Sequence, residues 1–168
     1  MSRFLANRLT KEQQSELRSE FYDIITTLSN KNEVELFFQD LLTLDELAML
    51  MRRIEVATLI RAGFSYRQVS DILGVGKDKI ANVQRSLQKD SSGYDIVIQR
   101  LLTESGYKKV GTVRSKNSEY ERLKRIPYSG LYLFHIIDEI GELLKANFDD
   151  TSPKKEQEIV SRMPTRRR

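Results

Sequence analysis

The sequence predicts an all-α protein. Residues that cap helices recur along roughly the first ninety positions, apolar side chains follow them at the spacing of one helix face, and glycines stand where those helices would end. The chain has 168 residues, of which 39% are hydrophobic and 31% charged. We therefore expect a small helical core with exposed, charged extensions.

Four helices are predicted to begin at capping boxes, in which an N-cap side chain accepts a bond from an early backbone N–H and a Glu or Gln three residues on reaches back. The four pairs are Thr10 with Gln13, Asn32 with Glu35, Thr43 with Glu46, and Ser65 with Gln68. The first helix should run to about Leu28, the third should end at Gly63, and the fourth should end at Gly74. A fifth helix should follow Gly76.

Apolar residues at helical spacing mark the inward faces of these helices. The predicted inward residues are Leu17, Phe21, Ile24, Ile25 and Leu28 in the first helix, Leu36, Phe37, Leu41 and Leu42 in the second, and Leu47, Leu50, Met51, Ile54, Ala57 and Leu59 in the third.

The second half of the chain is less regular. A helix is expected over Tyr94–Leu102, which completes a helix-turn-helix domain of residues 1–102. Residues 103–130 are polar and basic, with Gly and Pro as breakers, and we interpret them as a linker. Residues 131–148 return to a helical period, and their apolar face, with Leu133, Phe134, Ile137, Ile140 and Leu144, should pack on the core. Residues 149–168 are predicted to be a disordered basic tail that ends in three arginines.

Composition excludes several kinds of site. The chain has no cysteine, so disulfides, catalytic thiols and thiolate zinc sites are excluded. No apolar run reaches the ~20 residues that a membrane-spanning helix needs, and the N-terminus lacks the apolar stretch of a secretory signal. Lys and Arg exceed Asp and Glu by 28 to 24, a net charge of +4 that favours a polyanionic partner only slightly. We expect a cytoplasmic protein that does not bind membranes.

The segment Ser65–Leu87 has the pattern of a helix-turn-helix, because two short helical stretches flank a turn that contains Gly74. Six apolar residues would pack its two helices against each other and against the preceding helix: Val69, Ile72, Leu73, Ile80, Val83 and Leu87.

The outward face of the second helix of this unit then carries Lys77, Lys79, Ala81, Asn82, Arg85 and Ser86. These types suit a helix in the major groove of double-stranded DNA. An Asn can pair with adenine, an Arg or Lys with guanine or phosphate, and an Ala can meet a thymine methyl. Arg67 and Gln68 would meet the DNA backbone. Asp78 would either accept from cytosine or cap a helix that begins at Lys79.

Five stretches resemble the Trp repressor superfamily in order and spacing: Asp40–Glu46, Arg53, Arg61–Val69, Leu73–Gly76 and Ile80–Val83. The similarity extends through Tyr94–Leu101 and covers roughly residues 15 to 102. It is strongest to the Trp-repressor-like (YerC/YecD-type) subfamily, whose members carry no established corepressor. The resemblance implies an intertwined, all-helical homodimer that presents two helix-turn-helix units to successive major grooves.

The resemblance also implies where a tryptophan corepressor would bind, namely between a Thr that starts the third helix, an Arg within that helix and a second Arg on the recognition helix. Thr43 and Arg53 match the first two positions. The second Arg is replaced by Asn82, and the small Gly beside it by Val83, which would crowd an indole. We therefore expect no tryptophan corepressor, with Thr43 acting as an N-cap and Arg53 pairing with a carboxylate across the dimer.

Catalysis is not expected, and neither is a cofactor or a metal. The single histidine, His135, lies on the amphipathic C-terminal helix, and the carboxylate pairs Glu139 with Glu142 and Asp149 with Asp150 have no His or Cys nearby. The function favoured is a sequence-specific transcriptional regulator, most simply a repressor. The alternatives are a non-specific or mobile-element-associated DNA-binding protein, or a helix-turn-helix module for protein or RNA docking.

The basic residues of the predicted linker leave two interpretations open. They are Lys108, Lys109, Arg114, Lys116, Arg122, Lys124 and Arg125. They could reinforce contact with phosphates, or they could simply be solvated.

Overall fold

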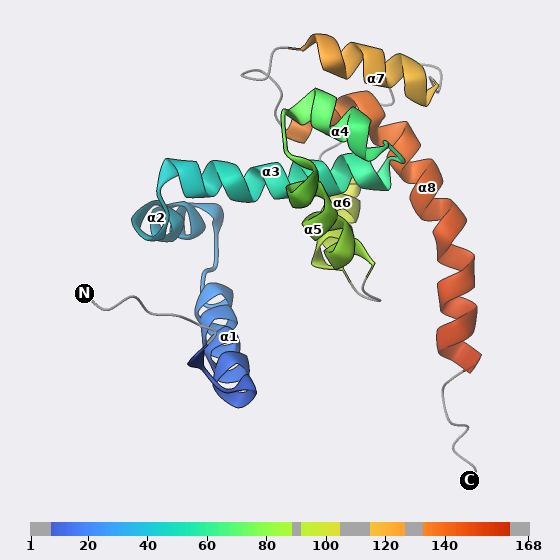
Figure 1. Ribbon diagram of the computed structural model, residues 1–168. Helices are drawn as coiled ribbons and strands as arrows, with labels where there is room; N and C mark the ends of the chain where they lie inside the picture. The colour runs from blue at the N-terminus through green and yellow to red at the C-terminus, as the bar shows by residue number, and fades with distance from the viewer. Residues whose placement is uncertain (1–7, 89–91, 105–114, 127–132, 162–168) are drawn as a thin grey trace. The chain divides into compact units, whose positions relative to one another are not determined.

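The computed structural model describes residues 8–88, 92–104, 115–126 and 133–161 (Figure 1). These residues form helices and no strand, which confirms the all-α prediction. The helices are α1 (Lys11–Thr26), α2 (Lys31–Leu41), α3 (Leu44–Arg61), α4 (Tyr66–Leu73), α5 (Lys77–Leu87), α6 (Gly93–Glu104), α7 (Lys116–Arg125) and α8 (Leu133–Ser161). The chain divides into two compact units, Met1–Leu47 and Ala48–Arg168, and α3 begins in the first and ends in the second.

The first unit is built from α1, α2 and the start of α3. The Thr10–Gln13 capping box of α1 is present, as predicted, with bonds in both directions. No residue of α1 or α2 is buried within the chain. The large apolar side chains that remain exposed on these two helices are Leu17, Phe21, Tyr22, Ile24, Val34, Leu36 and Leu41.

The predicted cap of α2 is wrong by two residues. The helix begins at Lys31, and the side chain of Asn30 rather than Asn32 accepts from the backbone N–H of Glu33, at 3.1 Å. The Glu33 carboxylate in turn accepts from the backbone N–H of Ser29, at 2.7 Å. Both Asn30 and Asn32 have a Glu three residues on, so the pattern fits either of them. Asn30 has the extended backbone of an N-cap, and the helix therefore begins about half a turn earlier than predicted.

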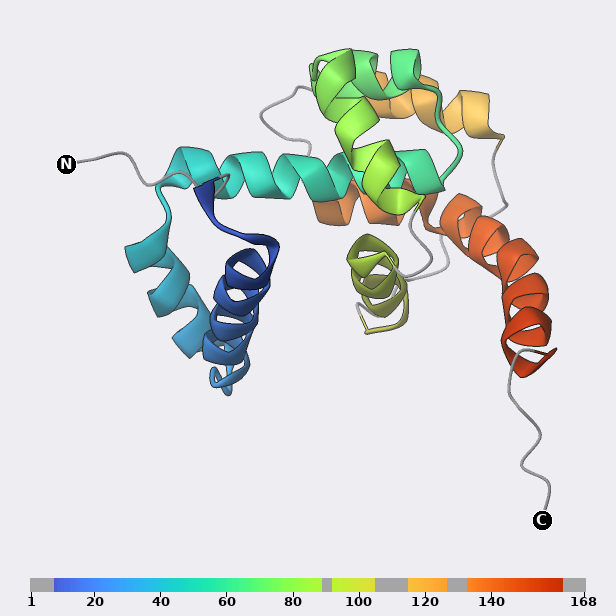
Figure 2. The same cartoon turned by 60° about the horizontal axis from the view of Figure 1, so that its bottom comes forward.

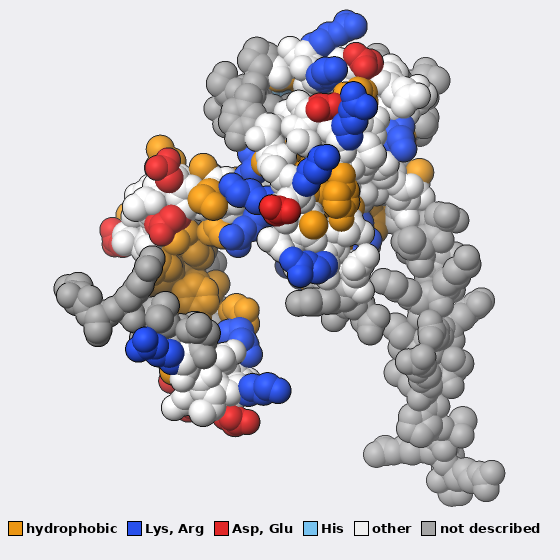
Figure 3. Space-filling model, in the orientation of Figure 1, with side chains coloured by type: hydrophobic (Ala, Val, Ile, Leu, Met, Phe, Trp, Pro, Cys, Tyr) orange, Lys and Arg blue, Asp and Glu red, His pale blue; other side chains and the backbone are white. Residues whose placement is uncertain are grey.

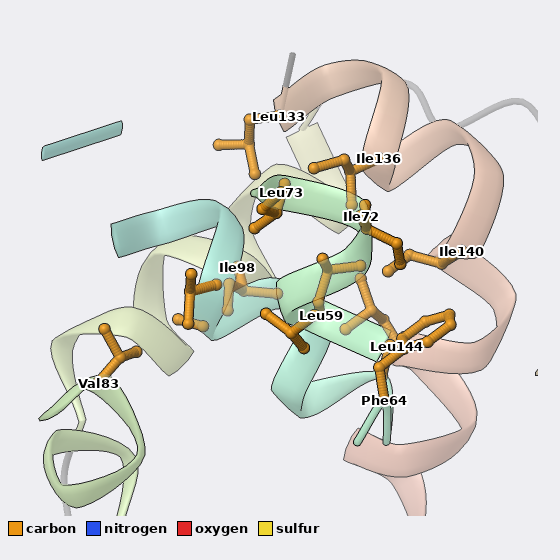
Figure 4. Close-up of a cluster of buried hydrophobic side chains, with 14 of the residues drawn as sticks. Leu59, Phe64, Ile72, Leu73, Val83, Ile98, Leu133, Ile136, Ile140 and Leu144 are labelled. Carbon is orange, nitrogen blue, oxygen red and sulfur yellow. The ribbon is translucent and has the colours of Figure 1, made fainter. Parts of the chain in front are cut away.

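The second unit has one hydrophobic core, to which α3 through α8 all contribute (Figure 4). The C-terminal half of α3 is its centre, with Val56, Ala57 and Leu59 buried. Leu47, Leu50 and Met51 were predicted to face inward with them, but these three side chains of the N-terminal half are exposed in the single chain. Periodicity locates an apolar face, but it does not say whether the same chain covers that face.

Helix α7 lies inside the segment 103–130, so the prediction of a linker is wrong for residues 116–125. Ser115 caps the helix, and its hydroxyl accepts from the Ser118 backbone N–H at 3.4 Å. Leu123 is fully buried and Glu119 nearly so, while most of the other side chains are exposed. Because only a narrow stripe packs inward, the sequence of α7 is too polar to show a helical period.

Helix α8 packs on the core as predicted, but with a slightly different face. Leu133, Ile137, Ile140 and Leu144 are buried, together with Ile136, whereas Phe134 is 58% exposed. The helix also continues to Ser161, beyond the predicted end and into the predicted disordered tail. The three terminal arginines lie outside the described residues.

Candidate nucleic-acid interface

Local interactions set the start of α4. Gly63 follows the end of α3 with φ +83, the left-handed conformation that turns the chain sharply. Ser65 then forms the predicted capping box: its backbone N–H donates to the Gln68 side-chain oxygen at 2.9 Å, and its hydroxyl accepts from the Gln68 backbone N–H at 3.3 Å. The side-chain oxygen of Gln68 is therefore committed to this cap.

The turn between α4 and α5 is equally well defined. Gly74 ends α4 with φ +62, and its N–H donates to the Ser70 carbonyl at 2.9 Å. The Ser70 hydroxyl donates to the Val75 carbonyl at 2.9 Å and holds the turn against α4. Helix α5 begins at Lys77 after Gly76, so Asp78 is not the cap of a helix that starts at Lys79. Asp78 instead lies in the first turn of α5, where a carboxylate interacts favourably with the helix dipole.

The inner face of the two helices is the predicted one. Val69, Ile72, Leu73, Ile80, Val83 and Leu87 are all buried and belong to the core cluster. Figure 4 labels Ile72, Leu73 and Val83 of this set. Since these side chains fix the rotation of α5 about its axis, the opposite side of α5 faces solvent.

That solvent-facing side carries the predicted reading residues. Lys77, Lys79, Asn82 and Arg85 are exposed, and Ala81 and Ser86 are half-buried. The Arg85 guanidinium donates to the side-chain oxygen of Asn82, so in the free protein these two side chains are held together. The face thus offers an amide, two ammonium groups and a guanidinium, all donors that suit guanine, adenine or phosphate.

On α4, Arg67 is exposed, with 90% of its side chain accessible, and Gln68 is half-buried. Nε of Arg67 lies 4.0 Å from Oδ2 of Asp71, one turn along the helix. The same Asp71 oxygen accepts from the Tyr120 hydroxyl of α7 at 3.0 Å. Figure 3 shows Lys and Arg side chains over α4, α5, α7 and the middle of α3, with acidic side chains among them.

Two residues that fix the far end of α5 were missed at the level of sequence. The Arg61 guanidinium donates to the Leu87 carbonyl at 2.8 Å and so satisfies one of the last carbonyls of α5. It also binds both carboxylate oxygens of Asp95, at 2.6 and 2.5 Å. Arg61 and Asp95 lie 34 residues apart, so no local pattern in the sequence could have connected them.

The two candidate tryptophan-binding residues lie in different units. Thr43 caps α3, because its hydroxyl accepts from the Glu46 backbone N–H at 3.3 Å. In return, the Thr43 backbone N–H and hydroxyl donate to the Glu46 carboxylate at 2.9 and 2.8 Å. These bonds lower the pKa of Glu46, the backbone bond being the larger cause. Arg53 is exposed in the second unit. The N-cap predicted for Thr43 is thus present.

Two of the four carboxylates singled out in the sequence are engaged in ion pairs. Glu139 accepts from Arg122, at 2.8 Å, and Glu142 lies 3.9 Å from the Lys145 ammonium. His135 is exposed on α8, and the side chains of Asp149 and Asp150 lie outside the described set. Within the described ranges, no group of three or more His, Cys, Asp and Glu could hold a metal ion. Over the same ranges, no helix has the length and apolar character to cross a membrane.

Comparison with known proteins accounts for about half of the chain. Residues 16–102 match the family model described as Trp repressor protein. The uncharacterized protein YerC of Bacillus subtilis (strain 168) is 30% identical over 82 residues, which are 49% of this chain and 79% of that protein. No solved structure gives a significant match. The family match covers most of α1 and ends within α6, so α7 and α8 lie outside it.

Proposed function

Since the chain belongs to the Trp repressor family of helix-turn-helix DNA-binding regulators, we propose that it is a sequence-specific transcriptional repressor that reads the major groove of duplex DNA with α5. The observation that carries the proposal is the division of α5 into a buried apolar side and an exposed side with donor groups. A helix-turn-helix needs both, because the first fixes the helix on its scaffold and the second meets base edges and phosphates.

The exposed residues of α5 divide into two roles. Asn82 and Arg85 occupy one face a single turn apart, and both can form paired hydrogen bonds with a purine edge, Asn with adenine and Arg with guanine. Lys77 and Lys79 lie in the first turn of the helix and suit phosphate or guanine contacts. On α4, Arg67 reaches the backbone beside the groove. The side-chain amide nitrogen of Gln68 can also do so, because the capping box uses its side-chain oxygen and its backbone N–H but not that nitrogen.

The exposed apolar residues of α1, α2 and the first half of α3 support a homodimer. Leu17, Phe21 and Ile24 lie on one face of α1 at helical spacing, and all three are exposed in the single chain. A stable soluble protein rarely leaves so many large apolar side chains uncovered. Because the family resemblance implies a homodimer, a second copy of the chain is the partner that would cover them. A dimer would present two α5 helices and would require two half-sites about one helical turn, or roughly 10 base pairs, apart.

Two features of α5 argue against a tryptophan corepressor. Val83 is only 4% exposed and belongs to the core, and it stands where the resemblance places a small Gly beside the indole ring. Asn82 stands where the family's ligand-binding Arg would be, and its oxygen is held by Arg85. We therefore propose a regulator whose DNA binding does not depend on tryptophan. Calorimetry with tryptophan tests this directly, and measurable binding would contradict it.

The decisive experiment is selection of bound duplexes from a random DNA pool. We expect a consensus with two related half-sites, and their spacing tests the dimer. Asn82→Ala should reduce the preference at one base pair per half-site by roughly 5- to 150-fold, the equivalent of a lost pair worth about 1–3 kcal/mol. Lys79→Ala should instead weaken binding to all sequences by a similar factor. Because Arg85 holds Asn82, Arg85→Ala should alter both preference and affinity.

The outcomes separate this proposal from its alternatives. Binding without a consensus would indicate a non-specific DNA-binding protein. Absence of duplex binding even at low salt would overturn the DNA-binding role and favour protein or RNA docking. An unchanged consensus for Asn82→Ala would show that the reading face is assigned to the wrong residues.

A further inference from the structure

Helix α7 lies directly beside α4, although it is outside the part of the chain that matches the family. At its start, the Lys116 ammonium donates to the Gly63 carbonyl, just before α4, at 3.0 Å. One turn later, the Tyr120 hydroxyl donates to Asp71, in the second half of α4, at 3.0 Å. The two helices therefore run side by side in the same direction, as Figures 1 and 2 show.

The position of α7 is fixed by packing, so it is not a tethered arm. Leu123 is 0% exposed within the core that α8 completes. Arg122 joins α7 to α8 through the Glu139 carboxylate, at 2.8 Å. Glu119 is buried beside this pair. The pKa of the Glu119 carboxyl is raised, mainly by burial and secondly by the negative charge of the nearby Glu139. The backbone of α7, which carries the exposed cations, is thus held in place before any ligand binds.

Four side chains contact one another in series across α4 and α7, with Arg67 at one end and Lys124 at the other. Arg67 and Tyr120 approach the same oxygen of Asp71, at 4.0 and 3.0 Å. The Lys124 ammonium lies 5.6 Å from the centroid of the Tyr120 ring. Asp71 is therefore contacted from both helices, while Arg67 and Lys124 remain exposed at either end.

The remaining charges of α7 leave its exposed side basic. Of its two carboxylates, Glu119 is buried and Glu121 exposed. All four of its cations are exposed, although Arg122 pairs with Glu139 and Lys116 donates to the Gly63 carbonyl. In Figure 3 the Lys and Arg side chains over α7 lie on the same face of this unit as those over α4 and α5.

We infer that α7 adds a second DNA-backbone contact to the helix-turn-helix, in which Lys124 and Arg125 bind phosphates next to the stretch that Arg67 meets. This inference rests on the proposed function, because it assumes that α4 approaches duplex DNA. The first helix of a helix-turn-helix, here α4, contacts the DNA backbone. Because α7 packs along α4, its exposed side faces the neighbouring phosphates of the same backbone. Rigid placement of the helix favours this contact, since little backbone order must be gained on binding.

The test is the salt dependence of affinity for a duplex taken from the selected pool, measured by fluorescence anisotropy. The variant is Lys124→Gln with Arg125→Gln, which removes two exposed charges and keeps helix-forming side chains. Each phosphate contact contributes about 0.9 to the slope of log K against log salt, so the slope should fall in magnitude by up to about 1.8 per protomer, or about 3.6 for a dimer on both half-sites. The consensus should not change, because phosphate contacts carry no base information.

The matched control is Arg100→Gln on α6, which Figure 2 shows on the opposite side of α3 from α4. Arg100 is also exposed, and its loss should leave the slope unchanged. An unchanged slope for the α7 variant, or an equal fall for Arg100→Gln, would overturn the inference while DNA binding by α5 stands. Failure of the parent protein to bind any duplex at low salt would overturn the proposed function itself.

Discussion

Replacing Leu144 by alanine would remove the largest part of one fully buried side chain of α8. Leu144 is 0% exposed, and it lies near Phe64 of the turn before α4 and near Ile140 (Figure 4). A Leu→Ala change at a packed position costs about 2–5 kcal/mol, because both burial and packing are lost. Against the 5–15 kcal/mol that is typical of folded domains, this is a large part of the total. For a chain of this length it corresponds to a fall in melting temperature of roughly 5 to 20 °C.

The measurement is urea unfolding followed by far-UV circular dichroism, with thermal melting as a second readout. Phe134→Ala is the matched control, since Phe134 lies on the same helix and is also a large apolar residue but is 58% exposed. We expect that variant to lie within about 0.5 kcal/mol of the parent protein, as surface changes usually do. The contrast between the two variants isolates burial from any general effect of shortening a side chain on α8.

A loss below about 1 kcal/mol for Leu144→Ala would refute the reasoning, because no well-packed Leu is removed so cheaply. It would mean that α8 is an appendage to the part of the chain that matches the family. The proposal for α7 would then lose its support as well, since α7 is held in place by α8 through Leu123 and Arg122.

Two further predictions concern the helix-turn-helix and the buried charge of α3. Gly74→Ala should destabilise the protein by about 1–2 kcal/mol in urea unfolding, because Gly74 has φ +62. Gly76→Ala should change little, because an added Cβ at Gly76 would meet nothing within 4 Å; equal losses at both positions would contradict the conformational explanation. The second prediction concerns Glu55, whose pKa is raised above 4.5 by burial. Nη1 of Arg52 lies 2.5 Å from Oε2 of Glu55, and this positive charge offsets the rise only in part. A raised pKa in the folded state contributes stability that is fully present below pH 4.5 and is lost as the pH rises through the folded pKa of Glu55. The Glu55→Gln variant should therefore gain stability relative to the parent protein between pH 4.5 and neutrality. A stability difference that does not vary with pH would contradict this explanation.

Sequence reasoning succeeded where the determining interactions are local. The capping boxes at Thr10 and Ser65 depend on residues three apart, and Gly74 ends α4 through its own backbone freedom. The inner face of α4 and α5 could also be predicted, since apolar residues occur on only one side of these short helices. The exposed donor face of α5, with Asn82 and Arg85, follows from that by elimination.

The same reasoning failed where two local solutions were equivalent. Asn30 and Asn32 both offer an N-cap with a Glu three residues on, and the sequence pattern does not rank them. On α8, Phe134 and Ile136 lie on different sides of a helix with apolar residues on both. Only the helices packed against α8 determine that Ile136 is buried and Phe134 exposed.

By itself, the sequence determined the helical class, the helix-turn-helix between Ser65 and Leu87 and the residues that face outward from it, because each depends on spacings of a few residues. Tertiary structure alone decided that α7 is a helix and that it lies along α4, because one buried apolar residue, Leu123, gives no helical period in the sequence. It also decided that Arg61 bridges Asp95 and the end of α5. These features join residues that are distant in sequence, and only packing of the folded chain brings such residues together.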